Sequence, residues 1–192
     1  MYIEDSWLSR LLDLAIFAMN PRERWPAHVT LAGPYTTKQE LPREVDFHQQ
    51  ISTFGAGHFR SNTQNTVYLH VGSADMQHHI RKPDYGSAIP HITLYNGLNH
   101  LLGDKYFEEV QKLRFFTHFY ATQLHQVESS KQLDLKLRSR VDLSILEETK
   151  GMMLDDFIDM PDVTRITVAV AALREALDSR FGRPAAPKYV VI

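Results

Sequence analysis

Two short stretches decide the fold, because residues 28–31 read His-Val-Thr-Leu and residues 91–94 read His-Ile-Thr-Leu. A proline lies just upstream of each stretch, and a turn signal follows each, Gly33-Pro34 after the first and Asn96-Gly97 after the second. Successive side chains of a strand point to opposite faces. The histidine and threonine of each stretch therefore share one face. We expect two strands that are anchored in the core by their aliphatic residues and present an imidazole and a hydroxyl into a cleft.

Two such pairs have the side chains that acid–base chemistry on a phosphate requires. A neutral imidazole takes a proton from water or from a ribose hydroxyl, and an imidazolium gives one to a leaving oxygen. Threonine hydroxyls can donate hydrogen bonds to the non-bridging phosphate oxygens. Positioning and charge stabilisation do most of the remaining work, so a metal ion is not obligatory. His28 and His91 are the candidate catalytic residues, and Thr30 and Thr93 are the candidate phosphate-binding residues.

The paired motifs resemble those of the 2H phosphoesterase superfamily, which has two His-x-Thr/Ser-x motifs with an aliphatic residue usually at the second position. The resemblance covers roughly residues 12–126 and includes a hairpin before the second motif. It implies an α+β, bilobal fold, in which two pseudo-symmetric antiparallel sheets surround a central cleft and each lobe supplies one motif. It also implies phosphodiester cleavage without a metal or other cofactor, with catalysis by His28 and His91.

Family substrates are 2′,3′-cyclic phosphates, ADP-ribose cyclic phosphate, 2′-5′-linked oligonucleotides, oligouridine ends and cyclic dinucleotide-type signals. The resemblance therefore implies a nucleotide or short RNA as the substrate. The alternative is a catalytically weak nucleotide sensor or sponge that uses the same cleft. The spacer between the motifs is shorter than in many members, and the C-terminal part has no counterpart in the family. We expect a core over residues 1–142 and a helical segment over residues 143–192 that packs on it, or that forms a lid, a dimer contact or a docking surface.

Composition excludes several other classes of protein. The 192 residues carry a net charge of −2, so a broad basic surface for long duplex DNA is not expected. The absence of cysteine excludes disulfides, thiolate metal sites and a cysteine nucleophile. The apolar stretch 11–19 is too short to span a bilayer and is interrupted by Asp13. We expect a cytoplasmic protein without membrane contact, and the sequence does not indicate its oligomeric state.

A few residues near the motifs are further candidates for substrate contacts. Tyr35 and Tyr95 follow the two motifs, where an aromatic ring can stack on a base or pack at the rim or in the core. Arg24 precedes the first motif and can clamp a phosphate or be solvated. His78 and His79 are adjacent in sequence, and neighbouring side chains seldom converge on one ion, so no metal site is expected there.

The rest of the chain is expected to be mixed α and β. The first apolar stretch favours a short helix over 5–12 and a buried strand over 12–19, and a single helix over 6–19 is the alternative that periodicity alone does not exclude. The turn cluster 61–65 predicts a hairpin. The other expected elements are strands at 28–31, 51–60, 66–72, 89–95, 115–126 and 133–138, a helix or loop at 38–50, and helices at 104–113, 143–159 with an interruption near Gly151, and 161–181 ended by Gly182.

Overall fold

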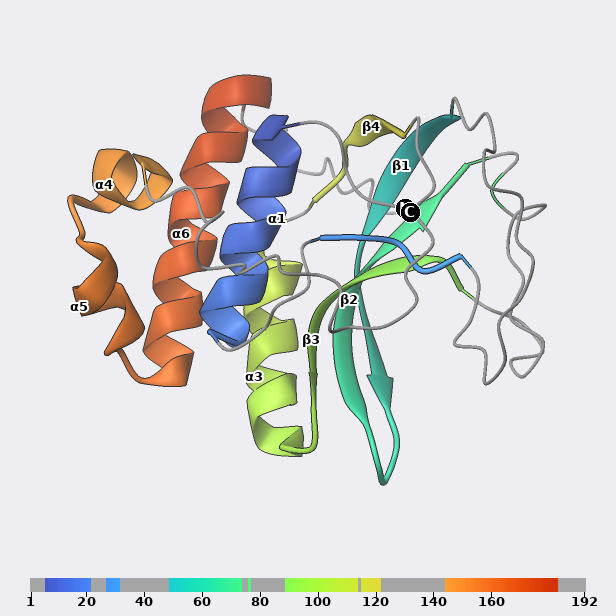
Figure 1. The fold of residues 1–192 in the computed structure, drawn as a ribbon, viewed down its shortest axis with the longest axis horizontal. Helices are drawn as coiled ribbons and strands as arrows, with labels where there is room; N and C mark the ends of the chain where they lie inside the picture. Colours follow the sequence, from blue (N-terminus) through green and yellow to red (C-terminus); the bar gives the residue numbers. More distant parts are fainter. Residues whose placement is uncertain are drawn as a thin grey trace, which may run out of the picture.

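A curled antiparallel sheet forms one layer of the molecule, and helices cover one of its faces (Figure 1). The computed structural model describes residues 6–21, 27–31, 49–73, 76, 89–113, 115–121 and 144–182. The sheet has the order β3-β2-β1-β4, and all neighbouring strands are antiparallel. Its strands are β1 (Gln49–Arg60), β2 (Asn65–Gly72), β3 (His91–Gly97) and β4 (His118–Ala121). The predicted mixed α+β class is confirmed, and the described strands form a single sheet rather than the two of a bilobal arrangement.

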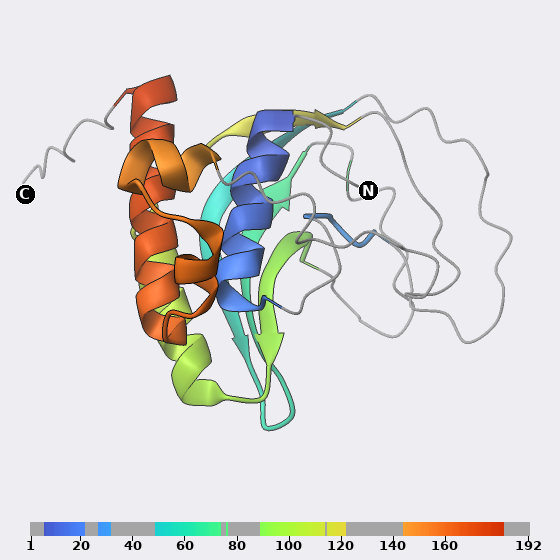
Figure 2. The same ribbon diagram turned by 60° about the vertical axis from the view of Figure 1, so that its left-hand side comes forward.

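The helices lie on one side of the sheet in both ribbon views (Figure 2). Helices α1 and α3 pack against the strands, and α6 packs against α1 and α3. The helices are α1 (Ser6–Met19), α3 (His100–Gln111), α4 (Ser144–Lys150), α5 (Leu154–Ile158) and α6 (Asp162–Phe181). Buried residues of α6 belong to the same hydrophobic cluster as α1 and the strands. Among the residues that the structure describes, no helix is both long and apolar enough to cross a membrane.

Helix α1 corrects the first secondary-structure prediction. Residues 12–19 are helical, so the predicted strand there is wrong and the alternative of a single helix over 6–19 is confirmed. From Leu8 to Met19, every side chain except that of Arg10 is buried. The helix lies between β3 and α6, and a helix that is covered on both sides is apolar around most of its circumference. Its sequence therefore shows the same continuous apolar run as a buried strand.

Residues 28–31 form an isolated bridge at Val29 rather than the predicted strand, and most of the other described elements follow the predictions closely. The hairpin is confirmed, with the Ser61 amide donating to the Gln64 carbonyl across the turn at 2.8 Å. The break between α4 and α5 falls at Gly151, whose φ is +61°, and α6 ends before Gly182. Helix α3 starts four residues before its predicted position, because the Asn99 side chain caps it by accepting from the Leu102 amide at 3.1 Å. Strand β4 lies within the predicted strand 115–126. The last two residues of the helix or loop predicted at 38–50 belong to β1, and its other residues, like 122–126 and 133–138, lie outside the described residues.

Two side chains donate hydrogen bonds to the buried C-terminal end of α1. The last carbonyls of a helix have no partner within the helix. The Arg165 Nε donates to the Ala18 carbonyl at 2.7 Å, and the Tyr106 hydroxyl donates to the Met19 carbonyl at 3.0 Å. Arg165 also donates to the Met160 carbonyl at 2.9 Å. Burial raises the pKa of Tyr106 to about 12, so its hydroxyl stays protonated as a donor at neutral pH. These contacts tie α1 to α6 and α3.

We expect Arg165→Met to lower the free energy of unfolding by about 2–4 kcal/mol, because the change leaves several buried carbonyls without donors. Urea denaturation followed by circular dichroism measures the effect. Arg174→Met is the matched control on the same helix, because Arg174 is exposed and its Nη2 donates to the Lys112 carbonyl at 3.0 Å. A loss at Arg165 no larger than the loss at Arg174 would contradict this account of the α1 terminus.

Candidate functional site

The first motif lies beside the second at the edge of the sheet. Val29 pairs with Ile92 of β3 in an antiparallel bridge, and the 27–31 segment runs alongside β3 in Figure 1. Both residues are fully buried, as are Leu31 and Leu94 within a few per cent. The chain therefore brings two motifs that are far apart in the sequence onto neighbouring backbone segments.

The polar residues of both motifs lie on the opposite face from this aliphatic anchor. Thr30 is exposed, and His28, His91 and Thr93 are partly exposed. The predicted alternation between polar and aliphatic side chains is confirmed in both motifs. We call these four residues the His-Thr quartet.

The antiparallel bridge determines which members of the quartet face each other. On either side of the Val29–Ile92 pair, His28 lies across from Thr93 and Thr30 lies across from His91. Cβ atoms of directly opposed residues are roughly 4.5–5.5 Å apart, and those of diagonal neighbours are roughly 7–8 Å apart. The two imidazoles therefore occupy diagonal positions, each with a threonine opposite it.

The ring of His91 is oriented by a hydrogen bond and by two aromatic rings. Its Nδ1 lies 2.7 Å from the Ile89 carbonyl oxygen, which can only accept, so Nδ1 carries the proton. The ring centroid lies 5.0 Å from that of Tyr68 and 5.4 Å from that of Phe59. In the neutral ring, Nε2 then has the lone pair that can accept a proton. The contacts leave His91 with a defined tautomer and a defined direction.

Tyr68 is held in turn by a glycine on the next strand. Its ring stacks on Phe59 at a centroid distance of 4.2 Å and crosses Gly57 of β1, its partner in the ladder. A Cβ added to Gly57 would lie 2.4 Å from the Tyr68 Cζ, so no other residue fits here without moving the ring. Burial also raises the pKa of the Tyr68 phenol. Gly57 thereby positions Tyr68, and Tyr68 positions His91.

A buried carboxylate anchors the first motif from the other side. Asp13 of α1 is buried, and its Oδ1 accepts from the Ala27 amide at 2.9 Å. Hydrogen bonds to an ionised acceptor are among the stronger ones in proteins. The sequence shows Asp13 only as a break in an apolar run. The signal that identifies it is that a carboxylate within a buried helix needs a hydrogen-bonding partner.

Of the further candidates for substrate contacts, the structure describes only Tyr95. Tyr95 is buried and its ring lies edge-on to Tyr106 at 4.9 Å, which favours the packing role over contact with a substrate. The register shift between Val67 and Tyr68 explains this, because it turns Tyr95 toward the face that carries Ile92. Arg24 and Tyr35 lie outside the described residues, as do His78 and His79. Within the described part of the chain, no group of three or more His, Asp or Glu side chains is arranged to hold a metal ion.

No family model, curated protein or solved structure matches this chain. The resemblance to the 2H phosphoesterases therefore stays a prediction that rests on the two motifs.

We expect Asp13→Ala to free the Ala27 amide and loosen the first motif, with a loss of about 1–3 kcal/mol in unfolding free energy. Amide hydrogen exchange should accelerate at Ala27 and Val29 more than in the β1–β2 hairpin. Asp13→Asn keeps an acceptor oxygen, so its exchange rates at Ala27 and Val29 should lie between those of Asp13→Ala and those of the natural protein. Asp104→Ala, which removes a half-exposed carboxylate on α3, is the control and should leave exchange at Val29 unchanged. Uniform acceleration throughout the sheet would show that Asp13 has no specific link to the motif.

Gly57→Ala should displace the Tyr68 ring and thereby change the surroundings of His91. The imidazole Hε1 resonance of His91 in NMR spectra reports this, because ring-current shifts depend on the two aromatic neighbours. Tyr68→Phe keeps the ring and should leave the resonance nearly in place. An unchanged His91 resonance in Gly57→Ala would refute the positioning role of this contact.

Proposed function

We propose that this protein is a metal-independent phosphodiesterase in which His28 and His91 exchange protons with a phosphodiester bound by Thr30 and Thr93. The observation that carries the proposal is the Val29–Ile92 pairing, which brings both motifs together with their polar residues on one face. A bilobal arrangement, with one motif supplied by each lobe, is part of the proposal.

The proposed reaction needs one neutral and one protonated imidazole. The neutral histidine takes a proton from water or a ribose hydroxyl, whose oxygen forms a bond to phosphorus. The imidazolium gives a proton to the oxygen whose bond to phosphorus breaks. Hydroxyl groups of Thr30 and Thr93 donate to the non-bridging oxygens as their negative charge grows. At the end, each histidine has exchanged its protonation state with the other, and solvent restores the starting form.

The contacts of His91 support its part in this scheme. A histidine that moves protons at one nitrogen benefits from a fixed hydrogen bond at the other, because the bond sets the tautomer and the direction of the ring. The Ile89 carbonyl has this relation to the His91 Nδ1, so Nε2 is the nitrogen that exchanges the proton. The substrate of the proposed site is a 2′,3′-cyclic phosphate or a short oligonucleotide.

His28→Ala or His91→Ala should lower turnover of a nucleoside 2′,3′-cyclic phosphate by about 10²–10⁴-fold, because each removes one proton-transfer group. Product formation is followed by liquid chromatography, and far-UV circular dichroism checks that the fold persists. His100→Ala on α3 is the matched control, because His100 lies outside the quartet, and it should retain turnover. Dialysis against EDTA should leave the natural protein active.

Full turnover in either alanine variant would contradict the mechanism. A natural protein that binds these nucleotides in calorimetry without converting any of them would instead be a sensor or sponge. A panel that includes cyclic nucleotides and 2′-5′ and 3′-5′ oligonucleotides separates these results.

A further inference from the structure

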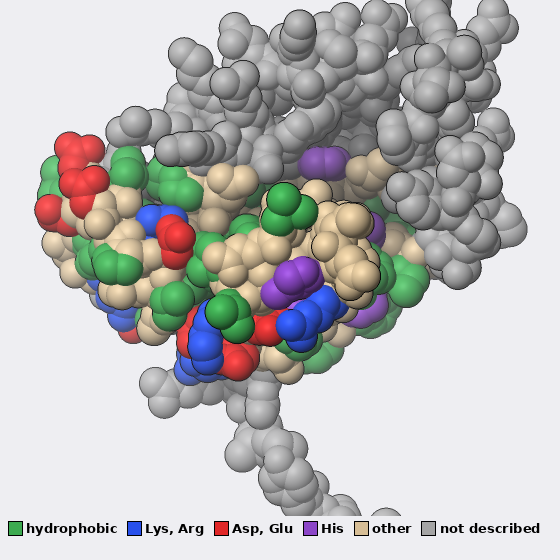
Figure 3. All heavy atoms as spheres, turned by 90° about the horizontal axis from the view of Figure 1, so that it is seen from below, with side chains coloured by type: hydrophobic (Ala, Val, Ile, Leu, Met, Phe, Trp, Pro, Cys, Tyr) green, Lys and Arg blue, Asp and Glu red, His purple; other side chains and the backbone are tan. Residues whose placement is uncertain are grey.

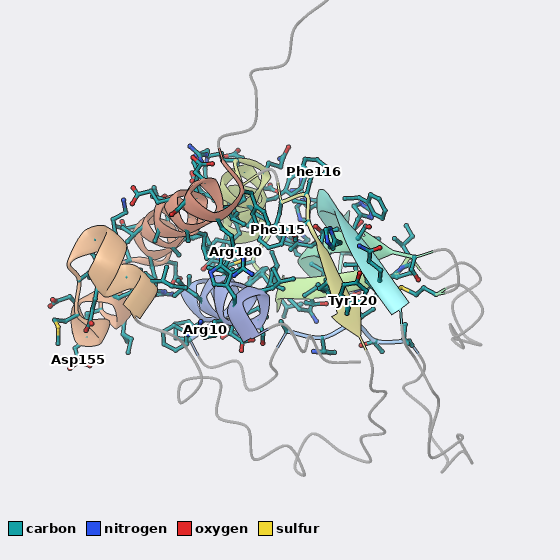
Figure 4. The ribbon with its side chains drawn as sticks, turned by 90° about the horizontal axis from the view of Figure 1, so that it is seen from above. Arg10, Phe115, Phe116, Tyr120, Asp155 and Arg180 are labelled. Atoms are coloured by element: carbon teal, nitrogen blue, oxygen red, sulfur yellow. The ribbon has the colours of Figure 1, made fainter. Side chains whose placement is uncertain are left out.

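The sheet face that carries the quartet continues to β4, where it presents exposed aromatic rings. Side chains alternate along this part of the chain, which Figure 4 labels at Phe115, Phe116 and Tyr120. Phe115 and Phe119 are 3% and 1% exposed and face the helices, whereas Phe116 and Tyr120 are 68% and 63% exposed. Two large rings therefore lie on the side of β4 away from the core, where burial stabilises neither of them.

A third exposed ring lies next to Phe116. Phe54 of β1 is 59% exposed at the bulge between Thr53 and Ala56. The pairing of Ser52 with His118, continued by two residues, places Phe54 across from Phe116. A Cβ on Gly72 would lie 3.1 Å from the Phe54 ring, so this ring crosses toward β2 on the same face.

A fourth ring links these to the quartet. Phe59 is 37% exposed, stacks on the buried Tyr68 and touches the ring of His91. Strands in a sheet are roughly 4.8 Å apart, so the face extends for about 14 Å from β3 to β4. We call Phe54, Phe59, Phe116 and Tyr120 the aromatic face.

The strands carry no acidic side chain that would repel an anionic ligand. None of the residues in β1 to β4 or in the 27–31 segment is Asp or Glu, although the whole chain has 23 acidic residues. Acidic and basic side chains intermix instead around α3 and the tip of the hairpin, where Arg60 pairs with Asp104 at 3.4 Å and Lys105 with Glu108 at 2.8 Å (Figure 3). A polyanion therefore meets no acidic side chain on the strands themselves.

We propose that the aromatic face binds the bases of a single-stranded oligonucleotide whose phosphodiester lies at the quartet. The proposal rests on the proposed function and specifies its substrate class. Bases stack on aromatic side chains with little dependence on sequence, and open four-stranded sheets bind single strands in this way. A mononucleotide has one base, which has two faces and stacks on at most two rings. The four rings lie on or next to the neighbouring strands β1 and β4, and the face on which they lie extends about 14 Å from the quartet strand β3 to β4, a length that accommodates more than one nucleotide.

Fluorescence anisotropy with labelled single-stranded oligothymidylates of two and of eight nucleotides tests this. The natural protein should bind the longer strand more tightly. Phe116→Leu and Tyr120→Leu remove a ring but keep an apolar side chain, and each should lower affinity for the longer strand at least about fivefold relative to the shorter. Phe116→Trp and Tyr120→Trp keep a ring and should preserve the length dependence. Leu101→Ala, an exposed apolar residue on α3, is the control and should change neither affinity.

Equal affinity for both lengths, or the same length dependence in the leucine variants as in the natural protein, would overturn the proposal. The proposal would also fail if the leucine variants changed their oligomeric state in size-exclusion chromatography but kept the oligonucleotide affinity of the natural protein. The face would then join two copies of the chain. The two proposals fail separately. If binding depends on the rings but the natural protein turns over no substrate, the phosphodiesterase proposal fails and the aromatic-face proposal stands. If turnover depends on the histidines but binding does not depend on the rings, the aromatic-face proposal fails and the phosphodiesterase proposal stands.

Discussion

The structure depends on the burial of most of α1, from Leu8 to Met19 except Arg10, between the sheet and α6. A helix in this position cannot leave polar groups unpaired, because each buried group without a partner costs about 1–3 kcal/mol. Its C-terminal carbonyls are paired with Arg165 and Tyr106, and the carboxylate of Asp13 accepts from the Ala27 amide. These hydrogen bonds connect α1 to α6, to α3 and to the first motif. The polar groups of this buried helix need hydrogen-bonding partners, and the Asp13–Ala27 bond that meets this need also holds the 27–31 segment in place.

The site is assembled from contacts that act on the two motifs separately. Asp13 holds the first motif from the helical side, and the Val29–Ile92 pair joins it to β3. The second motif is held within the sheet, where the Ile89 carbonyl and the Tyr68 ring orient His91. Preorganisation of this kind matters for the proposed chemistry, because a proton-transfer group acts only where its nitrogen meets the reacting oxygen.

The two proposals concern one continuous surface. The quartet would act on the phosphodiester, and the rings of β1 and β4 would hold the bases that flank it. Phe59 belongs to both regions, since it contacts His91 and stacks on Tyr68. In this arrangement the proposed proton transfer and the proposed preference for longer oligonucleotides depend on different residues, because the rings of β4 lie three strands away from His91.

The sequence by itself determined which side chains of the motifs share a face, the hairpin, the break at Gly151 and the course of α6, because strand alternation, turn residues and helix ends are local properties. It did not determine whether residues 12–19 are helix or strand, since a buried helix and a buried strand show the same apolar run. Only the tertiary structure decided that the motifs are neighbours, that Asp13 holds the segment before the first motif and that a bulge buries Tyr95. Pairing partners, register shifts and buried hydrogen bonds join residues far apart in the chain, so no local pattern contains them.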